Sequence, residues 1–292
     1  SFPDKKHSTF DRERILQVTM HPSDALKAAD SSQYEATVGI NTSFPWIAVT
    51  ITGDWHIGSE HTDYRLFKWY MDTILNTDGL FMMTVGDERD NFVISKFVSG
   101  LFESVASPEE QAEFVRQYLV ELDAKDKILA RCSGNHDHWT WVVSGQDLEK
   151  TWYKDMKSPL LATGGFVFVH VNGVEYKFYI HHGLSKFNSS FNPNHAVKRA
   201  WEFQGPFDIG ALGHVHVSEI AHGYRLADRF QQDYVQMRTG TFKLDDTYAR
   251  MLQLGRGQPP GATVLLNTHT KRMIPFMKLE DAVEALKALN SF

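Results

Sequence analysis

Short apolar runs alternate with amphipathic segments through the first half of the chain. Residues 46–52, 80–85 and 127–132 are mostly apolar, and a glycine follows each run within two residues. Runs of this length and composition are typical of strands that are buried on both faces of a sheet. Residues 64–75 instead place their apolar side chains at helical spacing. The pattern therefore predicts strands that alternate with helices.

Two of the expected helices carry capping residues at their starts. Thr62 or Asp63 can cap the helix at 64–75. Ser107 precedes Pro108, and Glu110 stands three residues after Ser107, which is the arrangement of a reciprocal capping box. We therefore expect a second helix to begin at Pro108.

The second half of the chain consists mostly of expected strands. Residues 166–171 and 174–180 flank Asn172-Gly173, which is a strong signal for a two-residue hairpin. Further strands are expected at 207–212, 234–242, 262–268 and 272–276, and a helix closes the chain. This order predicts an α/β fold in which two packed sheets form a β-sandwich flanked by helices. Residues 1–45 are expected to form a polar N-terminal arm with one short helix near Ser23, and residues 46–292 a single domain.

Composition narrows the class of protein. Apolar residues make up 42% of the 292 residues and charged residues 23%, which is typical of a globular chain. We find no apolar run of about 18 residues, so no membrane span is expected. Cys132 is the single cysteine, which fits a reducing compartment and a cytoplasmic location. The net charge of −6 gives no basic footprint for general nucleic-acid binding.

Five short clusters rich in Asp, Asn and His each follow an expected strand. They are Asp54-Trp55-His56, Gly86-Asp87-Glu88-Arg89-Asp90, Gly134-Asn135-His136-Asp137, His181-His182-Gly183 and Gly213-His214-Val215-His216. Ligands in α/β folds lie beyond the carboxyl ends of strands, where all five clusters are expected. Oxygen and imidazole donors without sulfur suit Mn, Fe, Zn, Co or Ni. Five clusters supply enough donors for two ions, and two adjacent ions point to hydrolysis of a phosphate ester.

Two clusters leave a choice between residues or roles. Asp54 and His56 are two residues apart, so an extended backbone would direct both side chains to one ion. His181 and His182 compete for one ligand position. Asp137 suits either a contact that supports a metal ligand or a helix cap.

The ordered series Asp-x-His, Gly-Asp-x-x-Asp, Gly-Asn-His-Asp, His-Gly and Gly-His-x-His resembles the calcineurin-like metallophosphoesterase superfamily. The series spans residues 54–216, over half of the chain. Its Gly-Asn-His-Asp form is similar to that of SbcD-type DNA-repair exonucleases and small bacterial phosphodiesterases. The resemblance implies a two-sheet sandwich with helices on both sides, in four αββα layers.

The resemblance also implies a role for each motif residue. Two divalent ions, with manganese as the first expectation, would be held by seven residues, with Asp87 shared between the ions: Asp54, His56, Asp87, Asn135, His182, His214 and His216. His182 is expected as the ligand in preference to His181, because the family places the ligand directly before glycine. His136 would be the catalytic histidine, and Asp90 would pair with it and orient it.

The expected reaction is phosphoester hydrolysis by a hydroxide that bridges the two metals. His136 would donate a proton to the leaving group or stabilise its charge. Protein Ser/Thr phosphatases carry Arg-Gly after the second motif and Glu at the end of the third, whereas this chain has Asn91-Phe92 and Asp137. We therefore expect a phosphodiesterase that acts on nucleotides or nucleic acid such as DNA. A small-molecule phosphomonoesterase and a non-catalytic scaffold are the alternatives.

Three residues near the motifs are candidates for substrate contacts: Arg89, His138 and Trp139. Arg89 offers a cation for phosphate. Trp139 or Trp141 offers a ring on which a base can stack, although packing in the core is the plainer interpretation of both tryptophans.

Overall fold

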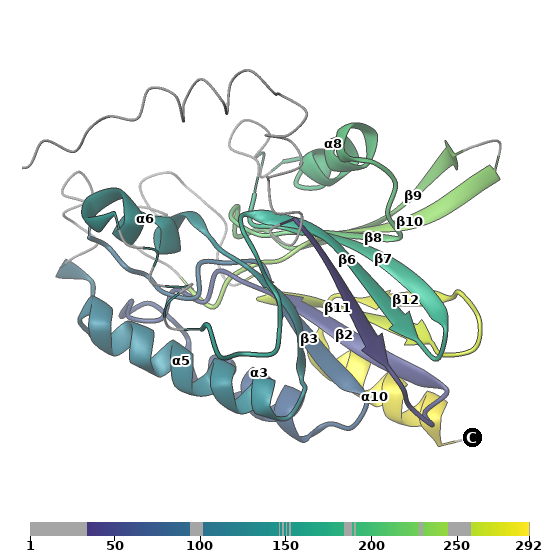
Figure 1. The fold of residues 1–292 in the computed structure, drawn as a ribbon, viewed down its shortest axis with the longest axis horizontal. Helices are drawn as coiled ribbons and strands as arrows, with labels where there is room; N and C mark the ends of the chain where they lie inside the picture. The colour runs from purple at the N-terminus through teal and green to yellow at the C-terminus, as the bar shows by residue number, and fades with distance from the viewer. Residues whose placement is uncertain are drawn as a thin grey trace, which may run out of the picture.

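The structure, a computed structural model, describes residues 34–93, 102–145, 147, 149, 151, 153–183, 189, 191–227, 230–244 and 258–291. The helix expected near Ser23 lies outside these residues. The described chain forms two six-stranded mixed sheets that pack face to face, with helices on both outer faces (Figure 1). The predicted α/β sandwich with flanking helices is confirmed.

The first sheet has the strand order β1-β6-β7-β8-β10-β9. Its strands are β1 (Glu35–Ile40), β6 (Gly164–Val171), β7 (Val174–His181), β8 (Ile209–Leu212), β9 (Glu219–Ala227) and β10 (Phe230–Arg238). The second sheet has the order β12-β11-β2-β3-β4-β5. Its strands are β2 (Trp46–Thr52), β3 (Leu80–Thr84), β4 (Ile128–Cys132), β5 (Leu160–Leu161), β11 (Gly261–Asn267) and β12 (Met273–Phe276).

In the described part of the chain, five helices cover the sheets and the ends of their strands. They are α3 (Tyr64–Asn76), α5 (Pro108–Ala124), α6 (Asn135–Ser144), α8 (His195–Gln204) and α10 (Leu279–Asn290). Helices α3, α5 and α10 pack on the second sheet, and α8 packs on the first (Figure 1). Asp63 caps α3 by accepting from the backbone N–H groups of Arg65 and Leu66. Ser107 and Glu110 form the expected capping box at the start of α5.

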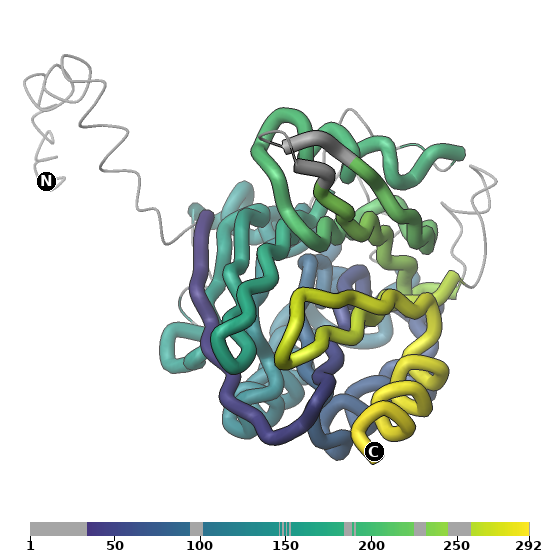
Figure 2. The backbone as a smooth tube through the Cα atoms, turned by 90° about the vertical axis from the view of Figure 1, so that its right-hand side faces the viewer, coloured from purple at the N-terminus to yellow at the C-terminus, as the bar shows by residue number. Residues whose placement is uncertain are grey.

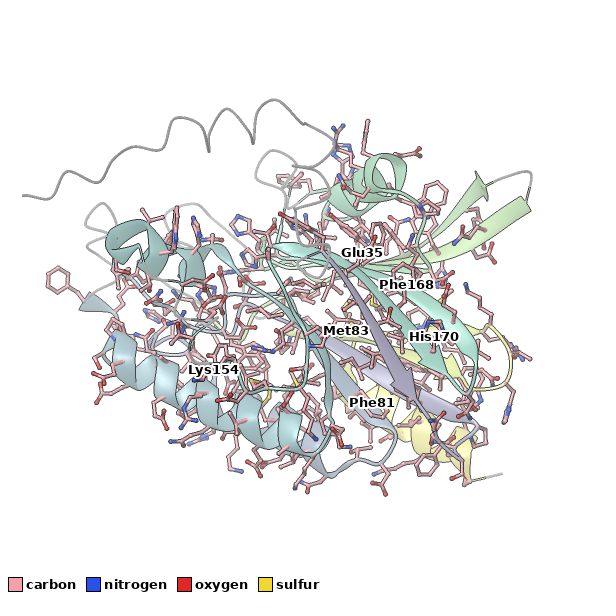
Figure 3. The ribbon with its side chains drawn as sticks, in the orientation of Figure 1. Glu35, Phe81, Met83, Lys154, Phe168 and His170 are labelled. Atoms are coloured by element: carbon pink, nitrogen blue, oxygen red, sulfur yellow. The ribbon has the colours of Figure 1, made fainter. Side chains whose placement is uncertain are left out.

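Three apolar clusters fill the three interfaces between the layers. The largest lies between the sheets and receives Ile47, Val49 and Ile51 from β2. Trp46 and Ala48 point to the other face of β2 and pack with the helices on that side. All seven residues of β2 are buried, which explains why this strand is mostly apolar along its whole length and does not alternate. Side chains from both sheets occupy the space between them (Figure 3).

The structure differs from the sequence prediction in the segment expected to be an arm. Residues Glu35–Ile40 form β1, which pairs in parallel with β6 along its full length (Figure 2). Only Ile40 of this strand is buried, and exposed positions alternate with half-buried ones. The weak alternation of an edge strand, which one glycine interrupts, conceals it in the sequence. The helix α8 and the strand β9 were also missed, whereas the hairpin of β6 and β7 at Asn172-Gly173 is confirmed.

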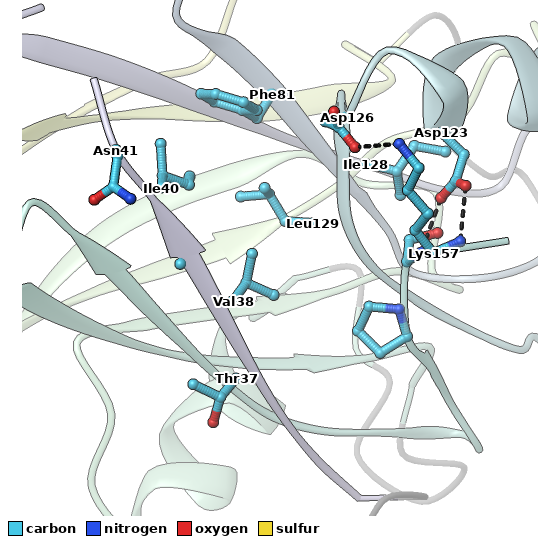
Figure 4. A pocket seen from close by; sticks show the side chains of 13 residues that line it. Thr37, Val38, Ile40, Asn41, Phe81, Asp123, Asp126, Ile128, Leu129 and Lys157 are labelled. Atoms are coloured by element: carbon cyan, nitrogen blue, oxygen red, sulfur yellow. Dashed lines mark hydrogen bonds and ion pairs between the residues drawn. The ribbon is translucent and has the colours of Figure 1, made fainter. Parts of the chain in front are cut away.

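One side of the sandwich holds a pocket of about 520 Å³, where β1 faces the edge of the second sheet (Figure 4). Apolar side chains such as Val38, Phe81 and Leu129 line it, and Asp126 pairs with Lys157 at its rim. No residue of the five motif clusters lines this pocket. Within the described part of the chain, no helix is long and apolar enough to cross a membrane.

The topology brings the motif clusters to one edge of the sandwich. Strands β2, β3 and β4 run parallel in one sheet, and β7, β8 and β10 run parallel in the other. The loops after β3 and β4 meet so closely that a Cβ on Gly86 would lie 2.4 Å from the backbone nitrogen of Gly134. Gly86 also has a φ of +89°, a backbone conformation that residues other than glycine rarely adopt. This contact fixes Asp87 relative to Asn135.

We predict that Gly86→Ala greatly destabilises the protein and separates these two loops. The added methyl group would overlap backbone atoms, which cannot move without shifting a whole strand end. Gly145→Ala is the matched control, because Gly145 has a φ of +70° but nothing within 4 Å of its Cβ position. The control should cost about 1 kcal/mol, from backbone strain alone. Urea unfolding of both variants measures the difference; equal losses would show that the close approach of the loops is unimportant.

Candidate metal centre

The seven expected metal ligands all lie just beyond strand ends, and they form two groups. Asp54 and His56 follow β2, and His216 follows β8. Asp87 follows β3, Asn135 begins α6, His182 follows β7 and His214 follows β8. In both groups, therefore, one sheet contributes the carboxylate and the other sheet contributes a histidine.

The first group consists of Asp54, His56 and His216. The Nε2 atoms of His56 and His216 lie 3.0 Å apart, and Nε2 of His216 lies 3.3 Å from Oδ1 of Asp54. Asp54 is fully buried, and its Oδ1 has no hydrogen-bond partner. A buried carboxylate oxygen without a partner is costly, so this atom is placed for a cation.

The second group consists of Asp87, Asn135, His182 and His214. Nε2 of His182 lies 3.1 Å from Oδ2 of Asp87 and 2.9 Å from Oδ1 of Asn135. Nδ1 of His214 lies 3.2 Å from Nε2 of His182. Nδ1 of His182 donates to the carbonyl of Val85 at 2.8 Å, so this ring is held in one orientation.

The spacing and chemistry of these atoms suit metal ions. Bonds of about 2.0–2.2 Å from an ion to nitrogen or oxygen place neighbouring ligand atoms about 3 Å apart. Most neighbouring donor atoms of the two groups lie 2.9–3.3 Å apart, whereas Nε2 of His56 and Oδ1 of Asp54 are 4.0 Å apart. They combine carboxylate, amide and imidazole donors, the set that favours first-row divalent ions. The residues of both groups could therefore hold metal ions.

Asp87 occupies the place between the two groups. It groups with His182 and His214, and also with His56 and His136. Its Oδ1 accepts a hydrogen bond from the backbone N–H of His136 at 2.8 Å, and its Oδ2 faces His182. Asp87 therefore lies within reach of residues from both groups.

The backbone of the ligands differs from the extended conformation expected of Asp54 and His56. Both have positive φ angles, of 50° and 47°, and the other ligands in this region are Asp87, His214 and His216. Strand β2 ends at Thr52, so these residues lie in a turning loop rather than in a strand. Their side chains still converge, because backbone bonds such as that from the N–H of His56 to the carbonyl of Asp87 fix the loop.

The contact between Asp90 and His136 differs from the expected side-chain pair. Nδ1 of His136 lies 2.6 Å from the backbone carbonyl of Asp90, and not against its carboxylate. The carboxylate turns instead to Nδ1 of His56 at 3.0 Å and to Nζ of Lys243 at 3.1 Å. Asp90 therefore contacts both histidines, with its main chain for one and its side chain for the other.

Arg89 is buried behind the ligands and does not face a substrate. It is 2% exposed, and its Nη2 lies 3.1 Å from Oδ1 of Asp137. The other oxygen of Asp137 accepts from the backbone N–H groups of Asp87 and Gly134, both at 3.1 Å. Asp137 thus serves both roles left open by the sequence, as a helix cap and as a support for a metal ligand, and Arg89 balances its charge.

The two tryptophans and two histidines on α6 differ in exposure. Trp139 lies over His136, with ring centroids 3.9 Å apart, and also contacts Phe92. His138 is exposed and stacks on Trp141, which is 50% exposed. Packing in the core was the plainer interpretation of both tryptophans, but Trp141 is half exposed and does not pack in the core.

His182, and not His181, lies among the metal-binding groups. Nδ1 of His181 accepts from the backbone N–H of Gly183 at 3.0 Å, and its ring stacks on Tyr179. Burial lowers the pKa of His181 to about 4. The neutral ring therefore contributes to packing beside β7.

Sequence reasoning missed the segment that follows β10. Thr241 donates to the carbonyl of Asp54 at 2.7 Å, and Lys243 pairs with Asp90. The expected strand at 234–242 ran past the true end of β10 at Arg238, which concealed a sixth loop at this edge. Its position beside the parallel strand β8 was the signal that could have revealed it.

Opposite charges stabilise the ionised forms of the buried ligands. Burial alone would raise the pKa of Asp87, but the charge of His182 and its hydrogen bond hold this pKa well below its usual range. The reciprocal effect of Asp87 outweighs burial and raises the pKa of His182 to about 10. Burial lowers the pKa of His56 to about 4, which keeps that ring neutral. A metal in the second group would replace the proton of His182.

A layer of buried acids lies behind these ligands. Carboxylate oxygens of Glu88, Asp137 and Glu149 lie within 4.8 Å of one another, and Ser133 donates to Glu149. Burial, followed by the charge of Asp137, raises the pKa of Glu149 to about 8. Glu149 therefore keeps its proton in the folded protein at neutral pH.

We predict that Glu149 contributes a loss of stability as the pH rises from about 4.5 to 8, and that Glu149→Gln removes this contribution. Over this window the folded state binds the Glu149 proton more tightly than the unfolded state, so rising pH favours unfolding. The amide of glutamine stays neutral at every pH. Urea midpoints at pH 5 and pH 8 test this, with exposed Glu121→Gln as the control. The same pH dependence in Glu149→Gln and in the wild type would contradict the assignment.

Comparison with known proteins gives matches at the level of solved structures. Vacuolar protein sorting 29 from Cryptosporidium parvum is 15% identical, with 81% of this chain and 100% of that chain covered and a TM-score of 0.40. A single mutant of Vps29 from Entamoeba histolytica is 11% identical, with 79% and 99% covered and a TM-score of 0.38. The nuclease MPE from Pseudomonas putida is 14% identical, with 78% and 87% covered and a TM-score of 0.34. No family model and no curated protein matches the chain. The assignment of the fold therefore rests on the two sheets and their strand order.

Proposed function

We propose that this protein is a dinuclear metal-dependent phosphoester hydrolase, and that it is a phosphodiesterase acting on nucleotides or nucleic acid. The observation that carries the proposal is the pair of donor groups that meet at Asp87, with His136 beside them. Nε2 of His136 lies 3.8 Å from Oδ2 of Asp87. Two cation sites that adjoin one histidine outside the ligand set suit phosphoester hydrolysis.

One ion would be held by Asp54, His56, Asp87 and His216, and the other by Asp87, Asn135, His182 and His214. Manganese is the first candidate, with Fe, Zn, Co and Ni as alternatives. When bound, such ions neutralise the charge of a phosphate ester and acidify water. The protein supplies the geometry, because neighbouring donor atoms within each group already lie 2.9–4.0 Å apart.

His136 would act on the leaving oxygen. The contact of its Nδ1 with the carbonyl of Asp90 requires the proton to be on Nδ1. A second proton on Nε2 then faces the site and can pass to the leaving group. Trp139 covers one face of the ring, and Phe92 approaches it at 5.2 Å. These rings hold the imidazole in place and limit the access of water.

A nucleotide substrate is favoured by the exposed ring pair of α6. His138 and Trp141 stack with ring centroids 4.9 Å apart, and both follow His136 on the same helix. Exposed rings near a phosphate site are suited to stacking with a base. Metal ions at the site would supply the positive charge that the acidic chain lacks.

We predict that His136→Ala lowers turnover by about 10²–10⁴-fold, the usual contribution of a general acid or base, without loss of metal. Asp87→Ala should lose both metal and activity, because it removes the carboxylate between the two donor groups. Metal content by mass spectrometry, together with turnover of bis-p-nitrophenyl phosphate with added Mn²⁺, separates the two variants. His170→Ala, on the half-exposed outer part of β6, is the control. Full activity in His136→Ala would refute its role.

We further predict faster hydrolysis of bis-p-nitrophenyl phosphate than of p-nitrophenyl phosphate at equal Mn²⁺. Both compounds release p-nitrophenolate, so the comparison isolates the phosphate group, and a diester carries one charge fewer than a monoester. A strong preference for the monoester would identify the protein as a phosphomonoesterase. Full metal loading without hydrolysis of either compound, or of dinucleotides and single-stranded DNA, would identify it as a scaffold.

A further inference from the structure

Lys243 is a buried cation at the back of the candidate metal centre. The residue is 8% exposed, and its Nζ lies 3.1 Å from Oδ1 of Asp90. The same carboxylate oxygen lies 3.0 Å from Nδ1 of His56. Asp90 itself is 1% exposed. One buried carboxylate oxygen is therefore shared between a lysine and a histidine of the first donor group.

Asp90 determines the orientation of two histidine rings. Its carboxylate accepts from Nδ1 of His56, and its carbonyl accepts from Nδ1 of His136. With the protons on Nδ1, the Nε2 atoms of both rings are directed into the site, toward His216 and Asp87 respectively. A carboxylate behind an imidazole fixes the tautomer that presents the other nitrogen to a metal.

This arrangement works only while the Asp90 carboxylate keeps its place behind His56. If the carboxylate turned away, Nδ1 of His56 would lose its acceptor, and the ring proton could move to Nε2 and close that nitrogen to a metal. An ionised carboxylate that is almost fully buried needs a countercharge. Lys243 is the cation in contact with this oxygen.

The chain holds Lys243 firmly in this position. Its backbone N–H donates to Oγ1 of Thr241 at 3.0 Å, and that hydroxyl in turn donates to the carbonyl of Asp54. Lys243 also forms a backbone bridge with Thr62. Its Nζ lies 5.6 Å from the ring centroid of Phe92. The segment is thus attached to the same loop that carries Asp54 and His56.

We propose that Lys243 is a positioning residue, which holds the Asp90 carboxylate against Nδ1 of His56 and thereby presents Nε2 of His56 to a metal ion. The proposal rests on the proposed function for the presence of the metal. The tautomer that it requires is a property of the protein without metal, so the two can be tested separately.

The test compares Lys243→Met with Lys243→Arg. In metal-free protein labelled with ¹⁵N-histidine, long-range ¹H–¹⁵N spectra identify the tautomer of His56, whose signals are assigned by their loss in His56→Gln. We expect the Nδ1–H tautomer in the wild type and in Lys243→Arg, and its loss in Lys243→Met. Calorimetric titration with Mn²⁺ should show about 10–100-fold weaker binding at one site in Lys243→Met, the usual effect of removing support from a ligand, with rescue by Lys243→Arg.

Lys271→Met is the matched control. Nζ of Lys271 lies 2.8 Å from Oδ2 of Asp208, another buried carboxylate, but neither residue touches the metal-binding groups. The control should leave the His56 signals and the affinity for Mn²⁺ unchanged. If Lys243→Met fails to fold, Lys243→Gln keeps a donor on a shorter side chain that no longer reaches Oδ1 of Asp90, and the same loss is expected.

The outcomes are distinct. If the Lys243→Met or Lys243→Gln protein keeps the Nδ1–H tautomer and wild-type affinity for Mn²⁺, the proposal is overturned. If the tautomer and affinity change as expected but the wild type hydrolyses no phosphoester, the proposed function fails and the role of Lys243 stands. An equal loss of affinity in Lys271→Met would reduce the effect to general stability and would also overturn the proposal.

Discussion

The central constraint on this structure is the burial of three carboxylates at the ends of adjacent strands. Asp54, Asp87 and Asp90 are each 1% exposed or less. Burying an ionised carboxylate costs several kcal/mol unless a cation and hydrogen bonds compensate for it. Within the described residues, histidines and one lysine face these groups, and Oδ1 of Asp54 and Oδ2 of Asp90 accept no hydrogen bond. Divalent cations would compensate the negative charge of such a site, and the loops around it keep the carboxylates in place.

A second cost arises from the backbone that presents these groups. Five of the candidate ligands have left-handed φ angles, and each such residue costs about 1–3 kcal/mol when the surroundings enforce it. Backbone bonds between the loops enforce it here, among them those from the N–H groups of Asp54 and Ile57 to the carbonyls of Gly86 and Glu88. The three apolar clusters between the layers provide the stability that offsets this strain. The rigid sandwich and the strained edge therefore depend on each other.

These constraints explain what could be predicted from the sequence. Strand β2 was predictable because both of its faces are covered, and α5 because its capping box is local in the sequence. The convergence of the five clusters followed from their positions after strands. Strand β1 was missed because an edge strand has only weak alternation.

The contacts of individual site residues were harder to predict. The direction of the Asp90 side chain depends on Lys243, which lies 153 residues away in the chain. No local pattern records such a contact, because it forms only when β10 takes its place beside β8. The burial of Arg89 likewise depends on Asp137, which lies across the gap between two strand ends. The types of the candidate ligand residues could therefore be predicted from the sequence. The ion pairs and hydrogen bonds behind them could not.

The cost of the site also bears on the choice between an enzyme and a scaffold. Natural proteins are only marginally stable, and left-handed aspartates and histidines at the ends of buried strands reduce that stability. A surface that only binds a partner gains nothing from a buried carboxylate oxygen without a hydrogen bond, or from His136 oriented by a main-chain carbonyl. A catalytic centre needs both, because the carboxylates hold cations and the histidine must face the leaving oxygen in one orientation. The strain at this edge is thus accounted for by hydrolysis and is unexplained by a scaffold, which is why we favour the enzyme.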